Sequence, residues 1–135
     1  MAKPRIPWDE LFARAEAARR KAYAPYSRFH VGAALYAPDG TIVAGCNVEN
    51  ASYGLALCAE RAAAGQLVAL GKRPIACAIV VDSKKPTPPC GMCRQVLAEL
   101  GSLDLVVISR TVRGNKQARW TLRALLPHAF TPDFL

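Results

Sequence analysis

The sequence predicts an α/β protein, folded as a three-layer α-β-α sandwich around a mixed sheet of about five strands. Stretches with helical spacing of apolar residues alternate along the chain with β-rich apolar runs. Their order is helix, hairpin, helix, strand, helix, strand, which implies a mixed sheet with helices packed on its faces. The 135 residues contain no internal repeat or long linker, so we expect a single domain over residues 1–135.

The first half of the chain predicts a helix followed by a hairpin. Apolar residues at helical spacing predict an amphipathic helix over residues 8–22. Two β-rich runs, residues 29–36 and 41–46, follow this helix. Pro38, Asp39 and Gly40 lie between the two runs and favour a tight turn, so we expect an antiparallel pair of strands.

The second half of the chain predicts two helices that alternate with two strands. Residues 58–70 are rich in Ala and Leu and are followed by Gly71, which is typical of a helix with a glycine after its C-cap. The continuous apolar run at residues 75–81 predicts a strand buried on both faces. A short helix is expected over residues 91–100, and another apolar strand over residues 103–109.

The composition is that of a globular protein. Apolar residues make up 52% of the chain and charged residues 21%, which excludes a disordered chain. The longest apolar run is residues 75–81, far shorter than the roughly 20 residues that span a bilayer. The first residues contain no apolar signal-peptide core, so we expect a cytoplasmic protein without membrane contact.

The net charge of +8 makes the surface attractive to anions. Nucleic acid binding is therefore a second interpretation of the chain. However, no aromatic residues alternate with the charges, as they do on surfaces that bind single strands. A solvated basic surface is the better interpretation, and nucleic acid is not the expected partner. The basic cluster near the C-terminus consists of Arg110, Arg113, Lys116, Arg119 and Arg123.

Three cysteines and one glutamate form a pattern typical of a catalytic zinc site. Thiols stay reduced in the cytosol, so the five cysteines are better explained as ligands, nucleophiles or core residues than as disulfides. Cys90 and Cys93 alone would also suit a redox dithiol or a structural zinc site. Cys58 lies two residues before Glu60 and supplies a third thiolate, which is the ligand number of a catalytic zinc that keeps one position for water.

The remaining cysteines and both histidines are assigned no chemistry. Cys46 and Cys77 lie in apolar strand contexts, so we expect them to be buried structural thiols. His30 lies alone on an expected strand, and His128 is expected at the surface.

Four segments of the chain resemble the cytidine deaminase family of zinc deaminases. They are YAPYSRFHVGAAL, GCNVENASYGL, CAER and PCGMCRQV, and the resemblance runs from about residue 23 to residue 130. A Cys-x-Glu segment, in place of His-x-Glu, resembles the small homotetrameric form that acts on free nucleosides. The resemblance implies a cytidine deaminase-like fold and one Zn²⁺ per subunit, held by Cys58, Cys90 and Cys93.

The resemblance also implies a reaction. This is the hydrolytic deamination of cytidine and deoxycytidine to uridine and deoxyuridine plus ammonia, in pyrimidine salvage. Glu60 would take a proton from water and return protons to ring N3 and to the departing amine. Three thiolates give a zinc centre a formal charge of minus one, which Arg61 and the two helix N-termini would offset. The alternative for Arg61 is an ordinary surface arginine.

Several substrate-binding residues follow from the resemblance. Phe29 would pack beside the pyrimidine, and the backbone of Ala59 would contact the base. Asn47 and Glu49 would form hydrogen bonds with ribose hydroxyls. The Glu49 carboxylate would also repel a phosphate, which favours nucleosides over nucleotides. A structural role in a strand or turn is the alternative for Phe29 and Asn47.

Two more residues are implied to act across a subunit boundary. Tyr53 and Phe130 match positions that neighbouring subunits contribute to the substrate pocket, so a homotetramer with shared active sites is expected. A strand or turn role is again the alternative for Tyr53. Two other functions stay open at this point: a deaminase or binding module acting on nucleic acid, and a structural zinc protein.

Overall fold

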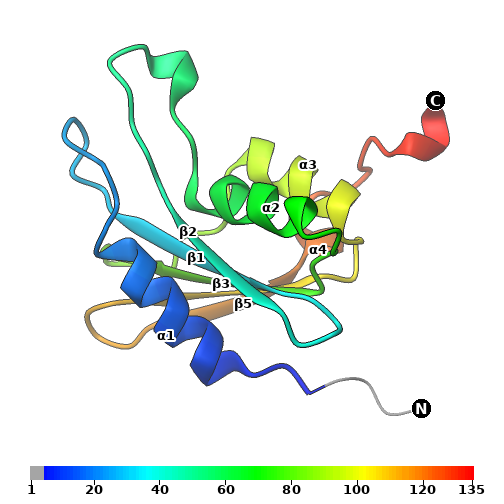
Figure 1. Cartoon of the computed structure of the whole chain (residues 1–135), viewed down its shortest axis with the longest axis horizontal. Helices are drawn as coiled ribbons and strands as arrows, with labels where there is room; N and C mark the ends of the chain where they lie inside the picture. The colour runs from blue at the N-terminus through cyan, green and yellow to red at the C-terminus, as the bar shows by residue number, and fades with distance from the viewer. Residues whose placement is uncertain (1–4) are drawn as a thin grey trace.

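The computed structural model describes residues 5–135 and arranges them in three layers (Figure 1). The expected domain starts at residue 1, so its first four residues lie outside this range. The middle layer is a five-stranded sheet. Helix α1 (Trp8–Arg19) covers one face of the sheet, and α2 (Ala59–Ala69), α3 (Gly91–Leu100) and α4 (Leu122–Leu125) lie on the other. The predicted α-β-α sandwich is confirmed.

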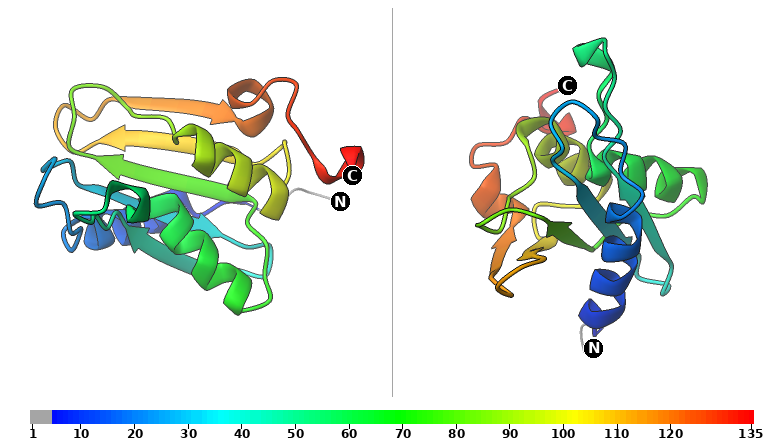
Figure 2. Two further views of the ribbon diagram at one scale, coloured as in Figure 1. Left: turned by 90° about the horizontal axis from the view of Figure 1, so that it is seen from above. Right: turned by 90° about the vertical axis from the view of Figure 1, so that its left-hand side faces the viewer.

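The sheet is mixed, as predicted, with the strand order β2-β1-β3-β4-β5. Strand β1 (Val31–Tyr36) pairs antiparallel with both β2 (Ile42–Cys46) and β3 (Ala76–Val81). Strand β4 (Val106–Thr111) is parallel to β3 and antiparallel to β5 (Gln117–Thr121). Figure 2 shows α2 and α3 lying on the same face of this sheet.

Each face of the sheet has its own apolar core. Leu11 of α1 packs with Ala78 of β3 on one face, and Leu67 of α2 and Leu97 of α3 pack with Ile79 on the other. Neighbouring residues of β3 therefore belong to different cores, as the alternation of side chains along a strand requires. All six residues of β3 are buried, which confirms the expected two-sided burial.

The first helix is shorter than predicted. It ends at Arg19, because the backbone N–H groups of Lys21 and Ala22 bond to the carbonyls three residues earlier. The next residue, Tyr23, donates its backbone N–H to the carbonyl of Asn47 and so begins to pair with another segment. The expected helix end at residue 22 is therefore wrong.

The strand expected over residues 103–109 is displaced from the observed strand β4 (Val106–Thr111), which begins later and ends later. The carbonyls of Leu103 and Leu105 accept hydrogen bonds from the first two backbone N–H groups of α4. These residues therefore lead into the sheet instead of pairing with β3, and the ladder with β3 runs from Val106 to Thr111. The short elements β5 and α4 were not predicted individually.

Gly45 in β2 allows α2 to pack directly on the sheet. A Cβ atom at this position would lie 2.7 Å from the backbone nitrogen of Ala63 and 2.8 Å from the carbonyl oxygen of Ala59. We expect Gly45→Ala to lower the free energy of unfolding by about 1–3 kcal/mol, because α2 must move away from β2. Urea denaturation measures this change.

Gly65→Ala is the control that separates the crowding of α2 against β2 from the effect of replacing a glycine in the backbone. Gly65 lies in α2, and apart from its own helix a Cβ atom at this position would meet no atom of residues 5–135 within 4 Å. Gly65→Ala is therefore expected to raise the stability by up to about 1 kcal/mol, through helix propensity alone. Equal denaturation midpoints for Gly45→Ala and the wild type would contradict the close approach.

Candidate active site

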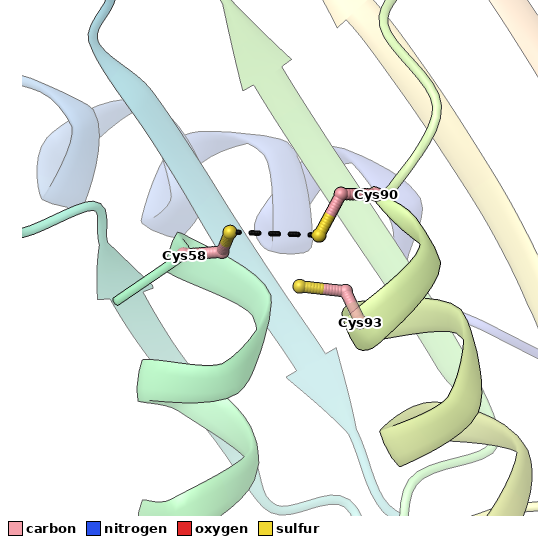
Figure 3. Close-up of side chains that lie close together, drawn as sticks. All are labelled: Cys58, Cys90 and Cys93. Atoms are coloured by element: carbon pink, nitrogen blue, oxygen red, sulfur yellow. Dashed lines mark hydrogen bonds between the residues drawn. The ribbon is translucent and has the colours of Figure 1, made fainter. Parts of the chain in front are cut away.

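The N-termini of α2 and α3 bring three thiols together. Cys58 is the N-cap of α2, and Cys90 is the N-cap of α3, with Cys93 in the first turn of that helix. Neither N-cap side chain makes a capping hydrogen bond with the backbone of its own helix, so both thiols face other groups. The three sulfur atoms lie within 4.8 Å of one another, and the Cys58 and Cys90 sulfurs are 3.7 Å apart (Figure 3).

The geometry of this cluster fits zinc. Tetrahedral zinc with Zn–S bonds of about 2.3 Å requires sulfur atoms about 3.8 Å apart, close to the 3.7 Å between Cys58 and Cys90. Thiolates are also soft ligands that zinc accepts readily. Within residues 5–135, the group contains no fourth His, Cys, Asp or Glu. Three protein ligands are the number of a catalytic zinc site, whereas structural sites have four.

Local contacts favour a thiolate at Cys58. Its pKa is lowered to about 5, chiefly by a hydrogen bond from the Cys93 thiol and further by Arg61. The same interaction raises the pKa of Cys93, which keeps its proton while Cys58 is charged.

Arg61 lies against the thiols. Its Nη2 donates to the Cys58 sulfur at 3.4 Å, and the contact with this thiolate raises the pKa of Arg61. Its Nε is buried and has no hydrogen-bond partner among residues 5–135. The guanidinium therefore keeps one buried donor unused, beside the charge-assisted contact that it makes with Cys58.

We expect Arg61→Ala to weaken zinc binding or lower kcat by about 10- to 100-fold, the range typical of groups that hydrogen-bond to metal ligands. Zinc affinity is measured by competition with a chromogenic chelator, alongside steady-state kinetics. Arg73→Ala is the control, because Arg73 is exposed and its side chain makes one hydrogen bond within residues 5–135, to the carbonyl of Leu100. Unchanged zinc affinity and kcat in Arg61→Ala would show that the thiolate charge needs no compensation from this side chain.

Glu60 is a buried carboxyl group beside the thiols. It occupies the second position of α2 and is only 5% exposed. Burial raises its pKa to about 7, with a further contribution from the negative charge of Cys58. A carboxyl group with a pKa near neutrality can both accept and donate a proton at physiological pH.

A cavity of about 160 Å³ lies against Glu60, Cys58 and Cys90. This volume is below the roughly 300 Å³ of pockets for drug-sized ligands, and it suits a single heterocyclic ring. Three residues with an expected substrate role, Phe29, Asn47 and Ala59, line the cavity.

The same cavity has lining residues that were not predicted. Ile79 comes from the buried strand β3, and Thr87 and Pro88 come from the loop that precedes α3. Pro88 stands two residues before Cys90, so its closeness to the clustered thiols was a signal in the sequence. Nothing in the sequence pattern marked Ile79, which was expected only as a core residue.

Glu49 lies in a neighbouring cavity of about 360 Å³ and not in the cavity with Glu60. Its carboxylate accepts the backbone N–H groups of Tyr26 and Ser27 at 3.0 and 3.2 Å, and it also accepts the Ser27 hydroxyl. These hydrogen bonds lower the pKa of Glu49, the Ser27 hydroxyl most strongly. Glu49 therefore stays charged and holds the loop that leads to Phe29.

The side chain of Asn47 is also engaged with the backbone. Its Nδ2 donates to the carbonyl of Phe29 at 2.7 Å, and its Oδ1 accepts the N–H of Val31 at 2.9 Å. Asn47 thus fixes the backbone on both sides of residue 30. Together, Asn47 and Glu49 hold the aromatic side chain of Phe29 at the cavity that contains Glu60.

Tyr53 and Phe130 are not brought to Glu60 within one subunit. Tyr53 lies in a short 3-10 turn (Tyr53–Leu55), lines the cavity of Glu49 and is 82% exposed. Phe130 lines neither cavity and is 60% exposed. This separation is compatible with a role in a neighbouring subunit.

The other two cysteines, Cys77 and Cys46, differ in how deeply they are buried. Cys77 is fully buried in β3, and burial raises the pKa of its thiol. Cys46 was expected to be buried but is only half-buried, because β2 is an edge strand and Cys46 lines an open cavity between α1 and α2. The expectation of a buried thiol is therefore wrong for Cys46.

The three-thiol cluster beside a buried glutamate, on an α-β-α sandwich, defines the class of zinc-dependent nucleobase deaminases. Residues 7–109 match the family described as the cytidine and deoxycytidylate deaminase zinc-binding region. The chain belongs to this family, whose defining feature is a zinc-binding region, and Cys58, Cys90 and Cys93 form a cluster able to bind one metal ion.

Relatives of similar length support the assignment. The chain is 50% identical over 124 residues to a cytidine deaminase of Halalkalibacterium halodurans, an alignment that covers 91% of this chain and 93% of that protein. It is 47% identical over 133 residues to a cytidine deaminase of Mycobacterium tuberculosis, covering 98% and 96%. The crystal structure of a cytidine deaminase from Burkholderia pseudomallei superimposes with a TM-score of 0.87 at 48% identity, covering 93% of this chain and all of that one.

Proposed function

We propose that this protein catalyses the zinc-dependent hydrolytic deamination of cytidine and deoxycytidine to uridine and deoxyuridine, with release of ammonia, in pyrimidine salvage. The observation that carries the proposal is the buried Glu60 carboxyl, with a pKa of about 7, at a ring-sized cavity bordered by metal-binding thiols. Family membership and the named relatives support the same reaction.

The metal and the carboxyl group have separate tasks. When bound by Cys58, Cys90 and Cys93, zinc supplies a Lewis acid that activates a water molecule. The carboxylate of Glu60 takes a proton from the attacking water, whose oxygen forms a bond to C4 of the pyrimidine. Glu60 delivers this proton to ring N3, then takes the remaining proton from the hydroxyl group on C4 and passes it to the amine, so that the C4–N bond breaks, the C4 carbonyl forms and ammonia leaves.

The two cavities suggest how a nucleoside is held. The base occupies the cavity of about 160 Å³, where Phe29 packs beside the ring and the backbone of Ala59 contacts its edge. The sugar extends toward the second cavity, near Asn47 and Glu49. The charge of Glu49 opposes a phosphate at this position, which favours nucleosides as substrates.

The proposed assembly is a homotetramer with shared active sites. Two exposed segments carry apolar side chains that one subunit does not bury: Tyr53 and Leu55 are 82% and 68% exposed, and Phe130 and Phe134 are 60% and 70% exposed. Tyr53 and Phe130 would complete the substrate pockets of neighbouring subunits. Analytical ultracentrifugation of the purified protein tests the tetramer.

The proposed setting is a cytoplasmic single domain. Within residues 5–135, none of the helices combines the length and the apolar character needed to cross a bilayer. All five cysteines are free, which suits a reducing compartment where a three-thiol metal site stays intact. Both apolar cores pack on one sheet, which supports a single domain.

The basic cluster near the C-terminus does not favour a nucleic acid substrate. Arg110 lies over the ring of Phe12 and bonds to Gln117, so its guanidinium is already engaged. Arg113 and Arg123 each pair with an aspartate, at 3.7 and 3.0 Å. Only part of the cluster is therefore available to an anion.

An ultraviolet assay with four substrates tests the proposed function. Purified, zinc-loaded protein is given cytidine, deoxycytidine, deoxycytidine monophosphate and a single-stranded oligonucleotide that contains cytosine. We expect turnover of the two nucleosides and little turnover of the others. Turnover of the oligonucleotide without turnover of nucleosides would favour a nucleic acid deaminase, and zinc binding without any turnover would favour a structural metal site.

A further inference from the structure

The segment after α4 buries little of its own apolar surface. Phe130 and Phe134 stack with ring centroids 5.7 Å apart, yet their side chains remain 60% and 70% exposed. Figures 1 and 2 show the segment projecting from the sandwich toward the C-terminus. Because burial within the subunit contributes little, polar contacts have a large share in fixing where this segment lies.

Two neighbouring side chains of α3 supply these contacts. Arg94 Nη1 donates to the carbonyl of Leu125, the last residue of α4, at 2.8 Å. Gln95 Nε2 donates to the carbonyl of Phe130, also at 2.8 Å. Within the described part of the chain, the Gln95 bond is the one hydrogen bond that joins residues 127–135 to the rest of the subunit.

Arg94 also holds the turn that carries the metal ligands. Its Nε donates at 2.7 Å to the carbonyl of Pro89, the residue directly before Cys90. No carboxylate of residues 5–135 lies within ion-pair distance of this guanidinium, so its charged donors serve the two carbonyls. One side chain therefore links the Pro-Cys turn to the end of α4.

We propose that Arg94 and Gln95 are positioning residues, which hold the Phe130 segment on the same helix that carries Cys90 and Cys93. Arg94 fixes the end of α4, where the segment starts, and Gln95 fixes the segment at Phe130. A subunit's metal site and its contribution to the neighbouring pocket are then assembled together. The inference rests on the proposed function, in which Phe130 completes the pocket of a neighbouring subunit.

Gln95→Ala tests the proposal, with Gln66→Ala as a matched control. Gln66 is also a helix-borne glutamine whose Nε2 donates to a carbonyl, that of Ala44 at 2.8 Å, but it touches neither the thiols nor the segment. We expect Gln95→Ala to raise KM for cytidine by about five- to tenfold, the effect of one lost hydrogen bond. Its kcat and zinc content should stay near the wild-type values.

Two further readouts do not depend on activity. In Gln95→Ala, the tetramer should dissociate at a higher protein concentration, and chymotrypsin should cleave faster at Phe130. Mass spectrometry identifies the cleavage site. Gln66→Ala should match the wild type in both measurements.

Arg94 is tested by Arg94→Lys, because Arg94→Ala leaves two carbonyls unpaired and is prone to misfolding. Lysine keeps the positive charge but lacks the planar fork that reaches two carbonyls at once. We expect Arg94→Lys to fold and to raise KM and the cleavage rate, as Gln95→Ala does. Wild-type KM and cleavage in Arg94→Lys would contradict the bridging role of Arg94.

The outcomes separate this inference from the proposed function. Equal KM, dissociation and cleavage for Gln95→Ala and Gln66→Ala, with a wild type that is an active tetramer, would overturn the positioning role alone. A wild type that is monomeric or inactive on cytidine would overturn the proposed function. In that case, the cleavage comparison still decides whether Gln95 holds the segment.

Discussion

Glu60→Gln is expected to lower kcat for cytidine by about 10²- to 10⁴-fold, the usual contribution of a group that transfers protons in the rate-limiting steps. Glutamine keeps the shape of the side chain but cannot accept a proton from water or deliver one to N3. Steady-state kinetics with a zinc assay checks this result. The zinc content should stay at the wild-type level, because Glu60 is not one of the clustered thiol ligands.

Glu99→Gln is the matched control for charge. Glu99 lies on α3 and is exposed, and it lines neither cavity near the thiols. Its substitution should leave kcat unchanged. A Glu60→Gln variant that keeps wild-type kcat would assign the proton transfers to another group.

Glu60→Gln should also stabilise the metal-free chain at alkaline pH. Burial raises the pKa of Glu60 from 4.5 to about 7, so between these pH values the unfolded chain binds fewer protons than the folded chain. The stability conferred by protonated Glu60 is therefore lost as the pH rises toward 7. At 1.36 kcal/mol per pKa unit, Glu60→Gln should gain on the order of 3 kcal/mol near pH 8 and little near pH 4. Urea denaturation of both metal-free proteins at the two pH values measures the difference.

Cys90→Ser is expected to have the second large effect, the loss of bound zinc and with it of all measurable turnover. Serine has nearly the same size, but its hydroxyl does not ionise at neutral pH and is a poor zinc ligand compared with a thiolate. Cys90 is exposed, so the substitution should not disturb the core. Atomic absorption after gel filtration measures the zinc content.

Cys46→Ser is the control for the loss of a thiol. Cys46 is half-buried on the edge strand β2 and lies outside the three-thiol cluster. The Cys46→Ser variant should keep both its bound zinc and its turnover. Zinc retained at the wild-type affinity in Cys90→Ser would show that the cluster is not the metal site.

The elements with strong apolar patterns were predictable from the sequence. The helix over residues 91–100 has the bounds of α3, and the apolar run at residues 75–81 contains β3, which begins one residue later, at Ala76. By contrast, β5 alternates between exposed and half-buried residues, and its strand conformation depends on pairing with β4. The four-residue α4 begins where Leu122 and Arg123 bond to the carbonyls before β4, a contact between distant segments that no local pattern reveals.

The residues of the candidate site were likewise only partly predictable from the sequence. The thiols and Glu60 were visible because their chemistry depends on residue type and spacing. The partners of Glu49 were not, since two of them are backbone N–H groups that any residue except proline would supply at positions 26 and 27. Arg94 was likewise missed, because its partners are carbonyls brought close by the fold.

The thiols that meet at the candidate metal site come from segments 32 residues apart along the chain. The intervening stretch contains α2 and the central strand β3. A metal bonded to Cys58 and Cys90 would act as a cross-link that closes this loop and reduces the conformational entropy of the unfolded chain, as a disulfide does. In a reducing compartment, where disulfides do not persist, the ion would thus serve folding as well as chemistry, and resistance to heat would track metal supply.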